Sequence, residues 1–220
     1  MKKGFTSIAK CVLLLCTVFA LNACIGASAD ISIRADGSGT ITLEYRIPHM
    51  LESLGRLDGN ERWPIIPVGR ADFERSLARV PGLRLRSFSS RENSAANGGR
   101  DIVIRAALDF SDTTALLAFL DITGSRVSLS RQGTASLLRL VLLDPSPQPI
   151  NADLASLLRE VSAGYEISVS LSAPGEASLA VIPPSVRAAR LVPQGRKVSF
   201  AIATGDLFSL TNGLALEIQW

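Results

Sequence analysis

The stretch DISIRADGSGTITLEYRI, residues 30–47, places apolar side chains at alternate positions on both sides of a glycine-rich turn. The first arm carries Ile31 and Ile33, and the turn is Asp-Gly-Ser-Gly at 36–39. The apolar residues of the second arm are Ile41, Leu43, Tyr45 and Ile47. A period of two around such a turn is typical of a β-hairpin with one buried face. The stretch therefore predicts the start of a sheet that is apolar on one side and polar on the other.

The rest of the chain continues with short alternating segments and a few helical ones. Residues 100–110 alternate in the same way, and 72–80 carries Phe73, Leu77 and Val80 at helical spacing. Further strands are predicted at 83–89, 127–130, 137–143, 165–171, 177–182, 187–192, 197–203 and 214–220, a helix at 49–57 and a helical turn at 206–210. These patterns predict an α+β fold, with a largely antiparallel sheet built from hairpins and three or four helices packed on it.

Two further helices are predicted from their N-terminal caps. We expect Ser111 to cap a helix that runs through Leu120, and Asn151 to cap one that runs through Ala163. The side chains of the second helix that should point inward are Leu154, Leu157, Leu158 and Val161. Each helix then has one apolar face to pack on the sheet.

Turns and loops are marked by proline, glycine and polar runs. Pro174-Gly175 should turn the chain between two strands, and 92–99 should form a polar loop. Residues 144–150 contain three prolines, which predicts a linker or sub-boundary there.

The N-terminus has the pattern of a secretory leader. MKKGFTSIAK, residues 1–10, carries three lysines and no acid, and an apolar run follows over 12–21. That run is shorter than the roughly 20 residues that a membrane span needs. We therefore expect residues 1–23 to be removed on export.

The end of this leader resembles the lipobox of bacterial lipoproteins, through Leu21-Asn22-Ala23-Cys24. The resemblance implies diacylglycerol on the Cys24 sulfur and a further acyl chain such as palmitate on the new N-terminus. Residues 24–29 would be a tether, and 30–220 an envelope domain. No Asp follows the cysteine, which by the same analogy favours the outer membrane. A plain cleaved leader with a chance cysteine is the alternative.

The mature part is similar to the LppM-type domain of bacterial lipoproteins. The similarity rests on the hairpin residues Ile31–Thr40, on Leu43-Glu44-Tyr45, and on the final strand 214–220. It implies a small α+β module at the envelope, with contact to lipid or glycolipid. It carries no catalytic residues over to this chain.

The charge of the chain argues against a nucleic-acid partner. There are 23 basic and 20 acidic residues, and the three extra positive charges are the leader lysines. The mature chain is therefore balanced, whereas nucleic-acid-binding domains carry a basic excess. No cysteine follows Cys24, so a hydrophobic core and not a disulfide must stabilise the fold.

Two groups of residues are candidate contact sites. Four arginines, with Arg91 nearby, could pair with phosphate on lipids or glycans: Arg75, Arg79, Arg84 and Arg86. The alternative for them is a solvated face. An apolar stretch between prolines could contact a partner or a membrane, or could simply cover the sheet: Trp63, Ile65 and Ile66.

The patterns of known catalytic and metal sites are missing from the sequence. His49 is the single histidine, no Gly-x-Ser-x-Gly elbow is present, and no phosphate-binding glycine loop occurs. We therefore expect no cofactor, no metal and no enzymatic activity. The function expected is that of a membrane-anchored envelope lipoprotein with a binding domain for lipid, glycan or protein. The alternatives are a structural part of an envelope assembly and, less favoured, a hydrolase.

Overall fold

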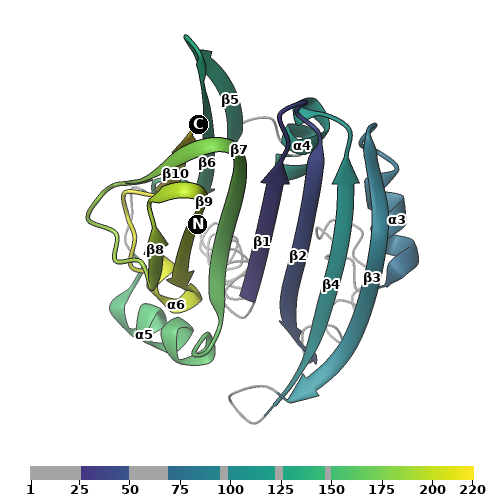
Figure 1. The fold of residues 1–220 in the computed structure, drawn as a ribbon. Coiled ribbons are helices and arrows are strands. Elements are labelled where there is room, and N and C mark those ends of the chain that lie inside the picture. The colour runs from purple at the N-terminus through teal and green to yellow at the C-terminus, as the bar shows by residue number, and fades with distance from the viewer. Residues whose placement is uncertain (1–25, 50–68, 95–98, 122–125, 147–149) are drawn as a thin grey trace, which may run out of the picture.

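A computed structural model of the chain describes residues 26–49, 69–94, 99–121, 126–146 and 150–220 (Figure 1). The strands in this part of the chain are β1 (Gly26–Ile33), β2 (Gly39–Pro48), β3 (Leu83–Ser94), β4 (Arg100–Phe110), β5 (Val127–Gln132), β6 (Ala135–Leu143), β7 (Glu166–Ile182), β8 (Arg190–Val192), β9 (Gln194–Ala203) and β10 (Leu214–Gln219). Its helices are α3 (Arg70–Leu77), α4 (Thr113–Leu120), α5 (Ala152–Val161) and α6 (Thr204–Leu207). The predicted α+β class is therefore confirmed, while the helix expected at 49–57 lies outside the described residues, apart from His49.

The hairpin predicted at 30–47 is formed by β1 and β2. Ile31 lies opposite Ile41, and both are fully buried. The turn is closed by Arg34 N–H donating to the Ser38 carbonyl at 2.8 Å, and by Ser38 N–H donating to the Asp36 carboxylate at 3.0 Å. Strand β1 begins at Gly26, four residues before the expected start, because Gly26 to Ala29 also pair with β2.

The sheet is mixed and not largely antiparallel as expected. Its strands follow the order β3-β4-β2-β1-β7-β10-β6-β5, with β9 on β7 and β8 on β9. Strands β1 and β7 run parallel, with Ala29 opposite Val169 and Ile31 opposite Leu171. A parallel neighbour requires a long connection, and here the five strands β2 to β6 come before β7 returns beside β1.

Strand β7 is one continuous strand, so the turn predicted at Pro174-Gly175 is wrong. Its first part lies beside β1 and its second part beside β10. The pairing with β9 is interrupted between Ser172 and Ala177. Proline lacks an N–H, so it fits at such an interruption without a lost ladder bond. The Arg196 guanidinium donates to the Pro174 carbonyl there at 2.9 Å. Strand β7 thereby joins two halves of a curled sheet (Figure 1).

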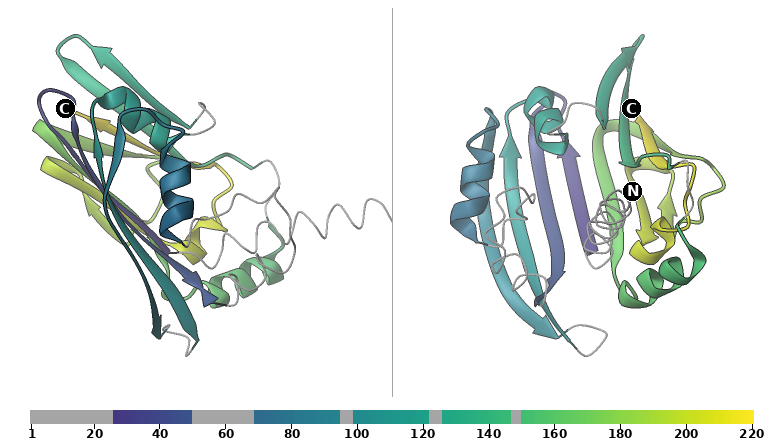
Figure 2. Two further views of the ribbon diagram at one scale, coloured as in Figure 1. Left: turned by 90° about the vertical axis from the view of Figure 1, so that its right-hand side faces the viewer. Right: turned by 180° about the vertical axis from the view of Figure 1, so that it is seen from behind.

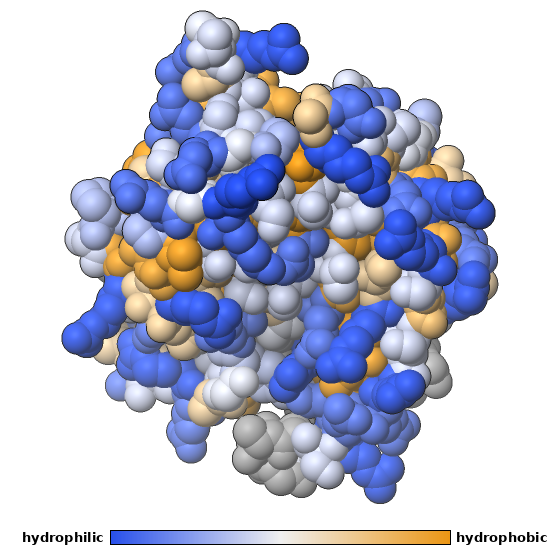
Figure 3. Space-filling model, viewed as in Figure 1, coloured by the Kyte–Doolittle hydropathy of each residue, from blue (hydrophilic) through white to orange (hydrophobic). Residues whose placement is uncertain are grey.

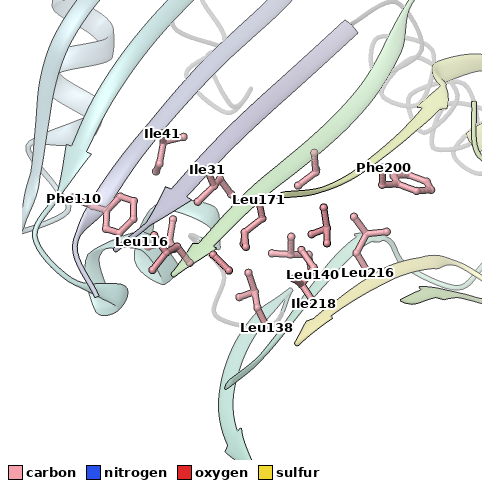
Figure 4. Close-up of a cluster of buried hydrophobic side chains, with 14 of the residues drawn as sticks. Ile31, Ile41, Phe110, Leu116, Leu138, Leu140, Leu171, Phe200, Leu216 and Ile218 are labelled. Carbon is pink, nitrogen blue, oxygen red and sulfur yellow. The ribbon is translucent and has the colours of Figure 1, made fainter. Parts of the chain in front are cut away.

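The main core lies on the inner side of the curled sheet. The strands β1, β2, β7 and β9 contribute one wall, and β6 and β10 contribute another (Figure 4). Its largest fully buried side chains include Phe200, Ile31, Leu171, Leu116 and Leu216. Helices α3, α4 and α5 lie on the same side of the sheet (Figure 2).

The outer face of the sheet carries paired charges. Glu44 accepts hydrogen bonds from Arg105 at 2.7 Å and from Arg46 at 3.0 Å, and Arg139 pairs with Glu217 at 2.7 Å. The face turned to the viewer in Figure 3 is accordingly mainly hydrophilic. The single polar face predicted from the hairpin therefore extends across the sheet.

The helix boundaries differ in detail from the expectation. Helix α4 is capped by Asp112 and not by Ser111: the Asp112 carboxylate accepts the Ala115 N–H at 2.9 Å. This bond and one from the Ser111 hydroxyl lower the pKa of Asp112. The Asn151 cap is confirmed, since its side chain accepts the Asp153 N–H at 2.8 Å.

Three further segments are placed differently by the structure. Helix α3 ends at Leu77, three residues before Val80, as the chain turns towards Pro81-Gly82. Strand β3 continues to Ser94, so the polar loop begins later than residue 92. The strand predicted at 187–192 is only the three residues of β8.

Helix α5 buries less of its apolar face than predicted. Leu158 is 2% exposed, whereas Leu157 is 56% and Val161 42% exposed. The helix is fixed on the side of Leu158 and Ser162 by α6, where Gly205 lies against Arg159 and Ser162. That contact turns Leu157 and Val161 away from the core.

A buried hydrogen bond joins the α5–β7 connection to the start of β4. The Tyr165 hydroxyl donates to the Asp101 carboxylate at 2.7 Å, and Asp101 is 5% exposed. Because Tyr165→Phe removes this donor from a buried carboxylate, we expect it to lower the free energy of unfolding by about 1–3 kcal/mol. A double-mutant cycle with Asp101→Asn, read by urea unfolding, measures the coupling. A loss below about 0.5 kcal/mol in Tyr165→Phe would contradict this role of the bond.

Candidate functional site

A mainly apolar cavity of about 200 Å³, partly open to solvent, lies between the two halves of the sheet. It is lined by Ala29, Ile31, Leu120, Arg126, Val127, Leu140, Val141, Leu142 and Val169. A dry apolar cavity of roughly 150 Å³ can take up benzene, whereas sites for whole drug-sized ligands occupy about 300–1,000 Å³. The space therefore suits a small apolar group or the end of an acyl chain.

One wall of the cavity comes from the parallel pair β1 and β7. Ala29 and Val169 are direct neighbours in this pair, and Ile31 lies two residues further along β1 on the same face. Ala29 has only a methyl side chain, so it leaves space where a larger residue would fill the wall. This wall exists because β7 returns beside β1, which no local sequence pattern reveals.

The opposite wall comes from the β5–β6 hairpin and the end of α4. Val127 and Leu140 are paired across this hairpin, and α4 contributes Leu120 as its last residue. Helix α4 packs against β5. The cavity is thus bounded by elements that are separate in the chain and meet only in the fold.

One edge of the cavity carries Arg126, which hydrogen-bonds to Asp121 and Asp144. The Asp121 carboxylate accepts the Val127 N–H at 2.8 Å and also the Arg126 N–H. The Arg126 guanidinium pairs with Asp144 at 2.5 Å, and the Arg126 side chain is 51% exposed. An apolar cavity with one half-exposed guanidinium beside it can accept an apolar chain that ends in an anionic group.

The arginine group predicted from the sequence does not form one cluster. Arg75 lies on α3, where it pairs with Asp72 at 3.3 Å, and Arg79 lies in the turn that follows. Arg84 and Arg86 lie on β3, where Arg86 pairs with Asp109 at 2.7 Å.

The arginines of α3 and those of β3 lie on opposite faces of the sheet. Leu83, Leu85 and Phe88 of β3 pack on the core, and the Phe88 ring lies 5.6 Å from that of Phe73 on α3. Arg84, which alternates with Leu83 and Leu85, therefore points to the face away from α3. The structure does not bring the four guanidinium groups together on one surface.

The other predicted site residues fall in different places. Cys24 and the stretch with Trp63, Ile65 and Ile66 lie outside the described residues. His49 follows β2, with Nε2 at 3.6 Å from the Glu92 carboxylate on β3. Burial raises the pKa of the Tyr45 phenol, whose side chain packs beside Ile47 and Ile104.

The described residues form neither a metal-binding cluster nor a membrane-spanning helix. The described part of the chain holds no group of three or more His, Cys, Asp or Glu side chains arranged to hold a metal ion. None of the helices within the described ranges is long and apolar enough to cross a bilayer.

Comparison with known proteins finds similar solved structures but no sequence family. Neither a family model nor a curated protein matches this chain. Among solved structures, the folded domain of LppM from Mycobacterium tuberculosis, determined by NMR, aligns with a TM-score of 0.39 and 15% identity. The alignment covers 89% of this chain and 88% of that one. A structural neighbour of this chain is therefore the LppM folded domain, at a low level of similarity.

Proposed function

We propose that this protein is a lipid-anchored envelope lipoprotein whose domain binds a lipid or glycolipid without chemical turnover. The observation that supports the binding role is the apolar cavity between β1–β7 and β5–β6, with Arg126 at its edge. An acyl chain end would fill the cavity, and a phosphate or carboxylate head group would replace Asp144 as the partner of the Arg126 guanidinium. None of the nine described residues that line the cavity is a nucleophile or a carboxylic acid, which favours binding over catalysis.

The anchoring role is supported by the lipobox pattern and by where the sheet begins. Strand β1 begins at Gly26, only two residues after Cys24. Two residues span at most about 7 Å, so acyl chains on Cys24 would hold the sheet close to the bilayer. Two or three acyl chains anchor a protein stably, whereas one anchors it only marginally. We place the protein at the outer membrane, because no Asp follows the cysteine.

The binding role predicts that filling the cavity weakens ligand binding. Ala29→Leu adds three carbons to the β1 wall, and these would displace a similar length of acyl chain. At about 0.8 kcal/mol per methylene, affinity should fall by at least about tenfold. Titration of a fluorescent fatty acid into the mature protein measures this change.

The titration needs mature protein that is free of detergent. The double substitution Leu21→Ala and Cys24→Ser provides it, because Ala-Asn-Ala at 21–23 becomes an ordinary small-x-small cleavage site and the thiol is removed. The matched control is Ala107→Leu, which adds the same bulk to the outer face of β4 and should leave affinity unchanged. Non-saturable binding, or equal affinity in Ala29→Leu and its parent, would contradict the proposal.

A structural role in an envelope assembly is the second candidate. It is favoured by β8, a three-residue strand paired only with β9 among the described strands, whose Leu191 and Val192 are 47% and 40% exposed. A hydrophobic area lies over β8 in Figure 3. A stoichiometric protein that is released from the detergent-extracted complex by Leu191→Glu would support this role, and lipid alone in the extract would argue against it.

A further inference from the structure

Two of the exposed apolar side chains lie on one face of α5. The large apolar residues of the described chain that are exposed are Leu157, Val161, Leu191 and Val192. Leu157 and Val161 are four residues apart, so they are neighbours on the helix surface. Leu154, three residues before Leu157, is half-buried and extends the same stripe. The apolar face of α5 is therefore wider than the part that the core covers.

The side of α5 that carries Leu158 and Ser162 packs against the fold, and this contact fixes the orientation of the helix. Leu158 is buried in the fold, and the Ser162 hydroxyl donates to the Leu158 carbonyl at 2.6 Å. A Cβ on Gly205 of α6 would lie 2.9 Å from both Arg159 Cγ and Ser162 Oγ, so the two helices are in close contact. Rotating α5 to bury Leu157 would break this contact. The exposed stripe is thus a stable feature of the surface.

Helix α5, which carries the stripe, lies at the end of the sheet where β1 begins. Strands β1 and β7 run parallel, so Gly26 lies next to the start of β7, directly after α5. A Cβ on Gly26 would lie 3.3 Å from the Tyr165 ring, and the Tyr165 N–H donates to the Ser162 carbonyl at 3.0 Å. Figures 1 and 2 show α5 at this end of the sheet.

We propose that α5 lies on the bilayer surface, with Leu157 and Val161 at the boundary between head groups and acyl chains. This inference rests on the proposed anchoring through Cys24, which would hold the bilayer within two residues of Gly26. The bilayer is then the nearest apolar phase to the stripe, and a short anchor leaves the domain few other orientations. Exposed guanidinium groups at the same end, on Arg46 opposite Gly26 and on Arg190 beside Glu166, face lipid phosphates in this orientation.

A thiol label on α5 tests this orientation in the full protein. Cys11 and Cys16 leave with the leader and Cys24 is acylated, so Leu157→Cys introduces the one free thiol. The variant is labelled with an environment-sensitive fluorophore and reconstituted into vesicles of phosphatidylethanolamine and phosphatidylglycerol. The matched control is Ser156→Cys, which is exposed on the polar side of the same helix. Both substitutions are at exposed positions and should leave the melting temperature unchanged.

The expected result is a blue-shifted, brighter emission at residue 157 that is quenched by nitroxide-labelled lipid, with water-like emission at residue 156. Water-like emission at both positions, or equal quenching at both, overturns the orientation. Intact-mass measurement of the same samples shows whether Cys24 is acylated, and so distinguishes a wrong orientation of α5 from a missing anchor. Acylated Cys24 with a water-exposed residue 157 rejects only the α5 contact, whereas a bare Cys24 rejects the anchoring and the contact together.

Discussion

Gly39→Ala is expected to lower the free energy of unfolding by about 3 kcal/mol or more. Gly39 is the first residue of β2 and is paired with Ile33 of β1 and Phe110 of β4. A Cβ at this position would lie 1.9 Å from the Ser32 carbonyl oxygen and 2.3 Å from Phe110 Cζ. The carbonyl belongs to the backbone of β1, so the clash cannot be relieved without moving the hairpin.

The matched control is Gly175→Ala, because a Cβ at Gly175 would meet nothing within 4 Å. That variant should unfold within about 0.5 kcal/mol of the wild type. Urea unfolding followed by circular dichroism measures both variants. Equal stability of Gly39→Ala and Gly175→Ala would show that the β1–β2–β4 junction is wrongly placed.

Loss of the Cys24 thiol is expected to move the mature protein from the membrane fraction to the soluble fraction. Two or three acyl chains are the anchor in this account, and each buried methylene contributes about 0.8 kcal/mol to membrane affinity. The Leu21→Ala and Cys24→Ser double variant tests this, because its leader is still removed. Fractionation followed by immunoblotting gives the distribution.

The single variant Leu21→Ala is the control for the altered leader, since it keeps Cys24 and shows what the cleavage site alone does. Cys24→Ser alone is less informative, because an uncleaved leader could hold the chain at the membrane through its own apolar run. A double variant that remains wholly in the membrane fraction after leader removal would contradict the acyl anchor.

Local patterns predicted the elements whose determinants are adjacent in sequence. The β1–β2 hairpin and β4 follow directly from alternation, and the Asn151 cap follows from one side chain. Asp112 instead of Ser111 caps α4, because either residue can accept the free N–H groups and only the backbone geometry selects between them.

Features that depend on distant segments could not be predicted in this way. The parallel pairing of β1 with β7 joins residues about 140 positions apart, and the pattern of either strand would also fit an antiparallel neighbour. Pro174-Gly175 has the composition of a turn, yet it lies at an interruption in the pairing of one long strand. A Pro-Gly pair therefore indicates that regular strand pairing is interrupted, but it does not show whether the chain then turns or continues straight.

The candidate site could not be predicted from the sequence either, because it is also built from distant segments. Ala29, Leu120, Arg126 and Val169 carry no common motif, and they meet because β7 and the β5–β6 hairpin enclose one space. On α5, periodicity identified the apolar residues but not which of them the core would cover. The exposure of Leu157 follows from the contact with Gly205, a residue about 50 positions away.

Mass spectrometry of the full-length protein, extracted from its native membrane in mild detergent, tests the anchored binding role most directly. The expected polypeptide comprises residues 24–220 and carries diacylglycerol on Cys24, and part of the population retains an additional non-covalent lipid. A free thiol at residue 24, or a chain that still carries residues 1–23, would contradict it.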